Sequence, residues 1–202
     1  WGLYIANFIF FIGISYAGAV ISGILHILNV EWRKPIIRIA EMITVIATII
    51  GPVFILLCVG RFDRLHHLIL YPRLQSPITW DVLAISTYFT GSVIFLYLAL
   101  IKDFAIYRDA NLNVPKWRKK IYKALAIGYR GTPSQKKHIS VSMNLMAIII
   151  IPLAIIVHSV LSWIFGMTLR PGWHSTIFGP YFVLAAIYSG TGCSSWLCGC
   201  TG

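Results

Sequence analysis

The sequence predicts an all-α polytopic membrane protein, a bundle of about five transmembrane helices. Five long apolar stretches are separated by short polar loops, and Lys and Arg are distributed very unevenly among these loops. Hydrophobic residues make up 58% and charged residues 11% of the 202 residues, which leaves no room for a sizeable soluble domain. Each stretch has about the 20 residues that a helix needs to cross ~30 Å of hydrocarbon. The expected spans are residues 5–28, 37–59, 79–101, 139–165 and 177–197.

The positions of Lys and Arg predict the orientation, because cytoplasmic loops retain these residues. Thirteen of the 17 lie in the segments 33–38 and 102–137, which follow the first and third spans. We therefore expect these segments on the cytoplasmic side, and the opposite loops and the N-terminus outside. The net charge of +11 comes from Lys and Arg residues that gather in alternate loops, and the sequence shows no aromatic platform on which bases could stack. Nucleic-acid binding is thus excluded as a function class.

The chain begins without an initiator Met and shows no cleavable signal, so we expect a fragment of a larger membrane subunit. It divides into a transmembrane domain, 1–192, and a Cys-rich tail, 193–202, where the composition changes abruptly in mid-helix. We expect this tail to be a truncated or aberrant end. Its cysteines, Cys193, Cys198 and Cys200, match no familiar zinc or iron–sulfur signature, so no metal site is expected.

Two local features refine the helices. Within the long basic loop, apolar residues are spaced for one face of a short helix that lies on the membrane surface. They are Trp117, Ile121, Tyr122 and Leu125. In the second span, Pro52 after Gly51 removes a backbone donor, which favours a kink.

Polar side chains inside the spans indicate function, because they are costly in lipid and usually face the bundle interior. Glu41, Thr44 and Thr48 share one face of the second predicted helix, at i, i+3 and i+7. This stripe is a candidate proton half-channel from the cytoplasmic side. In the alternative interpretation, Glu41 pairs with Arg38 in the headgroup zone while the threonines bond to their own backbone. The sequence leaves both open.

Asp81 follows Trp80 in the expected first turn of the third span, at the outer interface. Tyr88 and Ser92 continue its face at i+7 and i+11. Helix capping is one explanation, since the helix dipole favours an acid in the first turn by ~0.3–1 kcal/mol. A proton acceptor at the membrane edge is the other. Position alone favours capping.

Histidines provide a further set of candidates. His158 is the most deeply placed, and it can exchange a proton, hydrogen-bond a carbonyl ligand or tie two helices together. His66 and His67 are expected to be solvated in an outer loop, and His26 to be paired or to snorkel at the cytoplasmic end. The sequence contains no paired-carboxylate site, nucleophile elbow, phosphate-binding glycine loop or haem-attachment motif, so the chemistry of soluble enzymes is not expected.

Longer motifs run through five segments of the chain. They are WGLYIANFIFFIGISYAG at 1–18, RIAEMITVIATIIGP at 38–52, SPITWDVLAISTYFTGS at 76–92, VHSVLSW at 157–163 and PGWHSTIFGPYF at 171–182. Together and in this order they resemble the polysulfide reductase membrane-subunit family, also called NrfD-like. Within it, the resemblance is closest to the quinol-interacting subunits of alternative complex III and related molybdoenzyme anchors. It covers about residues 1–192.

The resemblance implies a multi-pass subunit of the bacterial or archaeal inner membrane. Such a subunit binds a quinone or quinol, menaquinone among them, as substrate near the outer face. It carries no permanently bound redox cofactor. It docks an iron–sulfur subunit on the outer face, as part of a larger membrane oxidoreductase complex.

The resemblance also implies roles for single residues. Trp80-Asp81 matches the family's Trp-Asp at the quinol pocket, which favours Asp81 as proton acceptor over a helix cap. His158 matches a His-Ser pair on a later helix, with a role in the pocket or in proton transfer. Tyr16 and Cys58 stand where many relatives have His. Tyr16 can still donate a hydrogen bond to a quinone carbonyl, but Cys58 substitutes poorly for a proton-accepting imidazole.

We therefore expect a membrane subunit of a respiratory oxidoreductase that binds quinol or quinone, exchanges electrons with an iron–sulfur partner, and releases or translocates protons. Asp81 is the expected catalytic residue, and Glu41, Thr44, Thr48 and Tyr88 the expected proton route. Two alternative functions stay open. One is an ion- or proton-coupled transporter or channel, and the other is a purely structural membrane anchor. The residues expected to bind the quinone are Tyr16, Cys58, Trp80, Asp81 and His158.

Overall fold

The computed structural model is all-helical over the part of the chain that it describes, residues 2–28, 33–59, 65–110, 115–167, 175 and 177–199. Five long helices occupy the five predicted spans, which confirms the predicted bundle. They are α1 (Gly2–Ile27), α2 (Arg33–Val59), α4 (Pro77–Asp109), α6 (Pro133–Gly166) and α7 (Phe178–Gly199). Two short helices lie in the connections, α3 (Leu65–Leu70) after α2 and α5 (Lys116–Leu125) after α4.

The long helices have the dimensions of membrane spans. α1, the part of α2 from Ile36 to Leu57, α4 and α6 are each long and apolar enough to cross a bilayer. α7 has 22 residues, a length that also matches a span. α2 continues through Pro52 without interruption, as α6 does through Pro152.

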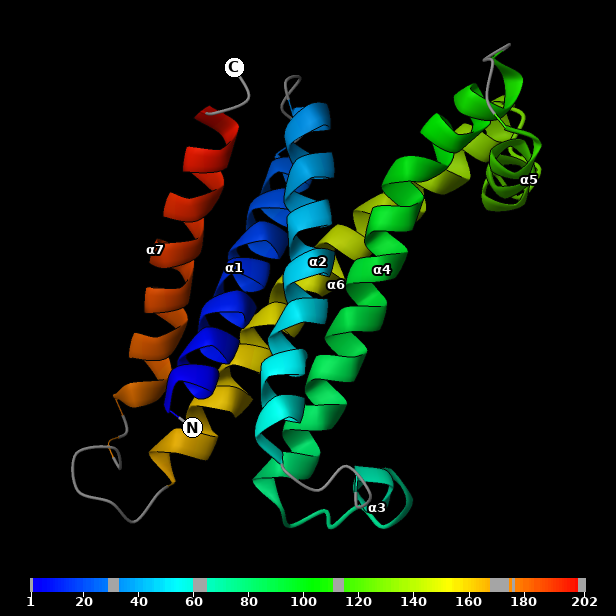
Figure 1. Cartoon of the computed structure of the whole chain (residues 1–202). Helices are drawn as coiled ribbons and strands as arrows, with labels where there is room; N and C mark the ends of the chain where they lie inside the picture. The colour runs from blue at the N-terminus through cyan, green and yellow to red at the C-terminus, as the bar shows by residue number, and fades with distance from the viewer. Residues whose placement is uncertain are drawn as a thin grey trace.

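The helices form one bundle in which α1 is central (Figure 1). α1 packs on α2, α6 and α7, while α4 packs on α6 and α2. α4 and α6 run together away from α1 and α7, toward the end of the bundle where α5 lies (Figure 1). The N-terminus of α1 and the start of α4 lie at the opposite end of the bundle, where α3 also lies beside the start of α4 (Figure 1). We call the end that holds α5 the basic end, and the end that holds the start of α4 the Asp81 end.

Small residues allow the close packing of α1. A Cβ atom at Gly18 would contact the Thr44 side chain and lie 3.0 Å from the Ala40 carbonyl oxygen of α2. On the other side, a Cβ atom at Gly190 of α7 would lie 3.0 Å from the Gly13 carbonyl oxygen. Glycines at such positions bring helix backbones together in a membrane, where packing rather than hydrophobic burial drives association.

Apolar side chains fill the bundle in layers. At the Asp81 end, Phe8, Ile12 and Leu161 are buried, with Phe54 and Ile85 packed against them. The middle is filled from α1, α4, α6 and α7. At the basic end, a smaller cluster joins α4 to the segment after α5, and its buried members are Ile101, Ala105, Ala126 and Tyr129.

The starts of α4 and α6 follow local sequence rules. Thr132 and Gln135 form a reciprocal capping box at the start of α6, and Pro133 occupies the first turn, where its missing N–H costs nothing. α4 also has a proline in its first turn, Pro77, but its N-cap residue Ser76 makes no side-chain cap bond.

Candidate functional site

Asp81 lies in the second turn of α4, not in the first turn where it was expected, because the helix begins at Pro77. The residue is only 7% exposed, and its Oδ1 has no hydrogen-bond partner. An acid that caps a helix accepts bonds from the backbone N–H groups of the first turn. Capping therefore does not explain Asp81. A buried polar atom without a partner is rare in folded proteins and calls for another explanation.

An apolar layer of the bundle is reached one helical turn from Asp81. Ile85, one turn further along α4, packs against Phe8, Ile12 and Leu161, which come from α1 and α6. Asp81 is thus one turn, on the same helix, from an apolar layer contributed by several helices.

Trp80 does not join Asp81 in the bundle interior. Its side chain is 52% exposed, and its Nε1 donates a hydrogen bond of 2.8 Å to the backbone carbonyl of Leu74, before α4. The structure therefore separates these sequence neighbours, with Trp80 on the outside and Asp81 inside.

The predicted face of α4 is confirmed. Asp81, Tyr88 and Ser92 are all buried, and Tyr88 is 2% exposed. Helix geometry places Asp81 and Tyr88 roughly 10 Å apart along the axis. The hydroxyl of Tyr88 donates to the backbone carbonyl of Ser15 on α1, at 2.9 Å, and lies 3.0 Å from the Ser15 Oγ.

Ser15 extends this contact to α2. Its Oγ lies 2.5 Å from the Thr48 Oγ1 and donates to the Thr44 carbonyl at 3.1 Å. Thr44 donates in turn to the carbonyls of Ala40 and Ser15. The backbone bonds of the two threonines agree with the alternative interpretation of the stripe, while the contacts with Ser15 and Tyr88 join three helices in one buried hydroxyl cluster.

Glu41 is fully buried near the basic end. Its Oε1 accepts a hydrogen bond from Ser22 of α1, and its Oε2 has no partner. Arg38, the partner of Glu41 in the alternative interpretation, binds Asp103 of α4 instead, at 2.9 Å. Glu41 thus points into the bundle rather than into the headgroup zone, and the ion pair with Arg38 that the alternative interpretation required is not formed.

Tyr16 and His158 meet in the centre of the bundle. Their ring centroids are 4.3 Å apart, and the two side chains are 1% and 2% exposed. Neither ring nitrogen of His158 has a partner within hydrogen-bonding distance and angle. The backbone carbonyl of Ala154, one turn earlier in α6, still interacts with the ring. Phe182 of α7 lies 6.0 Å from the imidazole. These two predicted quinone ligands are together, but no hydrogen bond or ring contact joins either to Asp81 in the residues that the structure describes.

Of the other histidines, His26 is paired and His66 and His67 are exposed, as predicted, although His66 and His67 lie in the short helix α3 rather than in a loop. His26 Nε2 lies 2.8 Å from Asn144 Oδ1, so it is paired across α1 and α6. His66 and His67 are exposed and contact each other. Cys58 lies in the last turn of α2, but its side chain is outside the described part.

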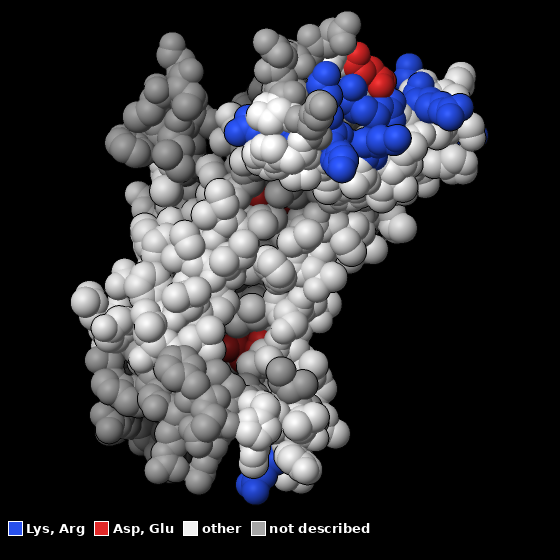
Figure 2. Space-filling model, turned by 45° about the vertical axis from the view of Figure 1, so that its right-hand side comes forward, with Lys and Arg blue, Asp and Glu red and all other residues white. Residues whose placement is uncertain are grey.

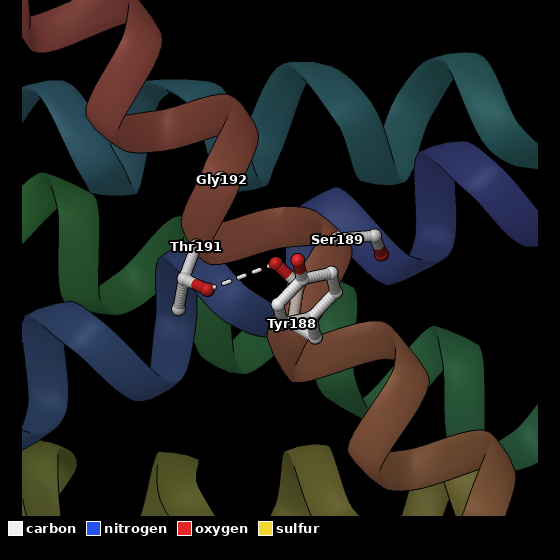
Figure 3. A pocket seen from close by; sticks show the side chains of 4 residues that line it. All are labelled: Tyr188, Ser189, Thr191 and Gly192. Atoms are coloured by element: carbon white, nitrogen blue, oxygen red, sulfur yellow. Dashed lines mark hydrogen bonds between the residues drawn. The ribbon is translucent and has the colours of Figure 1, made fainter.

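Two hollows at the surface lie apart from these buried groups. One, of about 490 Å³, is lined by four residues of α7 alone, Tyr188, Ser189, Thr191 and Gly192 (Figure 3). The other, of about 240 Å³, lies where α6 ends and α7 begins, and Trp163 and Phe178 contribute to its wall. Neither is lined by Asp81, Glu41 or His158.

Two serines of α1 were not predicted from the sequence. Ser15 belongs to the hydroxyl cluster, and Ser22 donates a hydrogen bond to Glu41. A signal was present, since Ser15, Gly18 and Ser22 recur at spacings of three and four, as small residues do at helix interfaces in membranes. Among the described residues, no group of three or more His, Cys, Asp or Glu side chains could hold a metal ion. The arrangement offers proton acceptors and hydrogen-bonding groups.

Comparison with known proteins gives consistent matches. The family model described as polysulphide reductase, NrfD, matches residues 1–198. A putative dimethyl sulfoxide reductase membrane subunit of Halobacterium salinarum is 27% identical over 193 residues, which cover 95% of this chain and 41% of that protein. A selenate reductase subunit of Mesobacillus selenatarsenatis is 25% identical over 197 residues, which cover 94% of this chain and 46% of that protein.

The chain spans less than half the length of either relative. The family model nevertheless runs through all five long helices and includes the segments that hold Asp81, Glu41 and His158. The resemblance suggested by the sequence motifs is thereby confirmed, and the chain belongs to the polysulphide reductase NrfD family.

Proposed function

We propose that this chain is part of the membrane subunit of a respiratory oxidoreductase complex, and that it binds a quinone or quinol at the Asp81 end of the bundle. The names of its two relatives, both of them reductase subunits and one a membrane subunit, support a role in such a complex. In this proposal the substrate is a lipid quinone such as menaquinone. Electrons pass to or from an iron–sulfur subunit docked at the same end, which faces outward from an inner membrane.

The observation that carries the proposal is the buried carboxylate of Asp81 with its unpartnered Oδ1. Oxidation of a quinol releases protons that need an acceptor, and a positioned carboxylate can take them. The neighbouring apolar layer around Phe8, Ile12 and Ile85 suits a hydrophobic ring and tail. The redox chemistry belongs to the quinone, so the residues of the chain supply position and proton transfer.

Tyr16 and His158 are the second part of the proposed site. The Tyr16 hydroxyl can donate to a quinone carbonyl, and both ring nitrogens of His158 lack hydrogen-bonded partners. The pair is buried deeper in the bundle than Asp81. We assign this pair to the inner edge of the quinone site. Trp80 is exposed, and we place it outside the pocket that holds the quinone ring.

The line of buried polar groups from Asp81 through Tyr88, Thr48 and Thr44 to Glu41 is the proposed proton route. Tyr88, Ser15, Thr48 and Thr44 are in hydrogen-bonding contact. The route has two gaps, one between Asp81 and Tyr88 and one between Thr44 and Glu41. Protons must cross both.

The test is the substitution Asp81→Asn in the full-length subunit, assembled in its complex. Asn keeps the size of the side chain but cannot accept the proton, so quinol:acceptor turnover should fall by ~10²–10⁴. Asp103→Asn is the matched control, because Asp103 is paired with Arg38 at the basic end. It should leave turnover within a few-fold of the parent. Near-normal turnover of the assembled Asp81→Asn complex would refute the proton-acceptor role.

A further inference from the structure

The basic end of the bundle carries charge that the chain itself does not neutralise. The segment 102–137 contains ten Lys and Arg residues and only two acids, Asp103 and Asp109, and no Asp or Glu follows Asp109 to residue 202. Asp103 is bound by Arg38. Asp109 is bound by Arg108 through two bonds of 2.7 and 2.8 Å. Figure 2 shows the resulting cluster of Lys and Arg at this end.

The helix α5 holds much of this charge, and it is fixed to α4. The Tyr122 ring stacks on Phe104 and Tyr107, with centroids 6.5 and 5.8 Å apart. The Leu125 carbonyl accepts a bond of 2.5 Å from the Tyr97 hydroxyl. α5 is therefore an ordered element and not a loose charged loop.

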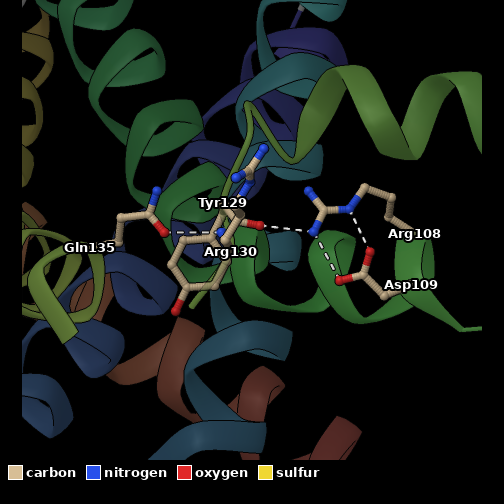
Figure 4. Close-up of polar contacts among 5 residues, drawn as sticks. All are labelled: Arg108, Asp109, Tyr129, Arg130 and Gln135. Carbon is tan, nitrogen blue, oxygen red and sulfur yellow. Dashed lines mark hydrogen bonds and ion pairs between the residues drawn. The ribbon is translucent and has the colours of Figure 1, made fainter. Parts of the chain in front are cut away.

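Hydrogen bonds also fix the segment after α5, at Tyr129 and Arg130 (Figure 4). Arg108 Nη2 donates to the Tyr129 carbonyl at 2.9 Å, and the Arg130 backbone N–H donates to Gln135 Oε1 at 2.9 Å. These bonds connect the segment to the end of α4 and the start of α6. The orientation of α5 is thus fixed both along its length and beyond its C-terminal end.

The surface of α5 has three parts. Tyr122 and Leu125 are half-buried against α4. Trp117 and Ile121, one turn apart, are 58% and 43% exposed and form an apolar strip with no partner in the described residues, apart from Arg118, which lies 5.2 Å above the Trp117 ring. The rest of the helix carries exposed cations, namely Lys119, Lys120 and Lys123.

From this arrangement we propose that α5 is an interfacial helix that binds the anionic phospholipid headgroups of the leaflet at the basic end. Trp117 and Ile121 enter the boundary of the acyl chains, and the three lysines contact headgroup phosphates. An apolar strip beside a Lys-rich face is the pattern of helices that lie in the membrane interface, and Trp is favoured at that depth.

The length of α4 places α5 at the right depth. Its 33 residues extend about 50 Å at 1.5 Å per residue, which exceeds the ~30 Å of hydrocarbon. The last turns of α4 therefore reach the headgroup zone, and these turns hold α5. Lipid is the occupant that matches both the charge and this position, whereas an acidic protein would leave the apolar strip unexplained.

The experiment measures lipid selectivity of the full-length subunit in bilayers of phosphatidylcholine with phosphatidylglycerol. Spin-labelled lipids report which headgroup is enriched in the shell around the protein. The parent should prefer phosphatidylglycerol, and salt should weaken the preference. The triple substitution Lys119→Gln, Lys120→Gln and Lys123→Gln should lower it by about threefold or more. Gln keeps α5 helical, because its helix propensity is close to that of Lys.

A second triple substitution carries the same loss of charge outside α5, at Lys102→Gln, Lys136→Gln and Lys137→Gln. It should change the preference much less. Equal loss in the two triples, or no preference in the parent, would overturn the proposal.

Hydrogen exchange of residues 116–126 in the unmodified protein provides an independent readout. Amide exchange in this segment should be slower in bilayers with phosphatidylglycerol than in phosphatidylcholine alone. Protection that depends on the other subunits of the complex, and not on phosphatidylglycerol, would assign the surface to a protein and contradict the lipid site.

Discussion

Tyr88 of α4 donates its hydroxyl hydrogen to the backbone carbonyl of Ser15 in α1, at 2.9 Å, in the buried centre of the bundle. Both helices pack on α2 and α6, and α1 also packs on α7. The bond adds a polar link to the apolar contacts between the two helices, such as that of Ile85 with Phe8 and Ile12. It also brings Tyr88 to the Ser15 hydroxyl, which in turn contacts Thr48 of α2.

The substitution Tyr88→Phe tests the structural part of this contact. It keeps the ring and removes the hydroxyl, so the free energy of unfolding should fall by about 0.5–2 kcal/mol, the range for a hydrogen bond between membrane helices. Denaturant unfolding in mixed micelles measures it. Tyr107→Phe is the control, since Tyr107 is 50% exposed and stacks on Tyr122. An equal loss in both variants would show that the buried bond is not the cause.

The close approach of α1 and α2 at Gly18 gives a second prediction. In Gly18→Ala the added methyl group meets Thr44 and lies 3.0 Å from the Ala40 carbonyl, so the helices must separate. We expect a loss of about 1–3 kcal/mol in unfolding free energy. In Gly91→Ala the methyl group makes ordinary contacts of 3.4 and 3.5 Å with Leu153 and Ile150, and stability should be unchanged or slightly higher. The same unfolding measurement compares the two, and a stable Gly18→Ala protein would contradict the packing at this point.

The sequence was sufficient to predict the fold because membrane spans are long and apolar. All five were found, and the spacing of Asp81, Tyr88 and Ser92 correctly predicted one buried face of α4. The short helix after α4 was found from four apolar residues, although two of them, Tyr122 and Leu125, pack on α4 rather than face the membrane. These features depend on periodicity within a single helix, which a sequence displays directly.

The partners of the polar residues could not be predicted, because they depend on the rotation and axial register of one helix against another. One of the two interpretations paired Arg38 with Glu41, three residues away, but Arg38 binds Asp103 on the neighbouring helix α4. Ser22, the residue that does bind Glu41, was not singled out, since a serine in a span can bond to its own backbone at little cost. Asp81 was misplaced by one turn because the start of α4 was set too late.

The orientation of the bundle is tested by cysteine labelling of the protein in right-side-out vesicles. The excess of Lys and Arg at 102–137 predicts that this segment is cytoplasmic. A membrane-impermeant maleimide should therefore react with Leu70→Cys, where Leu70 is 66% exposed, and spare Lys119→Cys until the vesicles are opened. Both changes are made in a background without the native cysteines. The reverse pattern would move the proposed quinone site to the other side of the membrane.

The last prediction concerns Glu41, whose Oε1 accepts from Ser22 while its Oε2 lacks a partner in a fully buried position. Glu41→Gln keeps the shape and the acceptor for Ser22 but cannot exchange a proton. If Glu41 ends the proposed route, the number of protons translocated per quinol in proteoliposomes should fall sharply. Quinol:acceptor turnover in detergent, which depends on Asp81, should stay within a few-fold of the parent.

Asp103→Asn serves again as the control at the same end, because its carboxylate is already paired with Arg38. It should leave the proton yield unchanged. A normal yield in the assembled Glu41→Gln complex, or a parent complex that moves no protons, would remove Glu41 from the route. The Asp81 site would stand in either case, because Asp81 and Glu41 lie at opposite ends of the bundle and a gap separates each of them from the hydroxyl cluster. Loss of turnover together with proton yield would instead show that the two carboxylates act in one obligatory step, since protons released at Asp81 would then have no other exit.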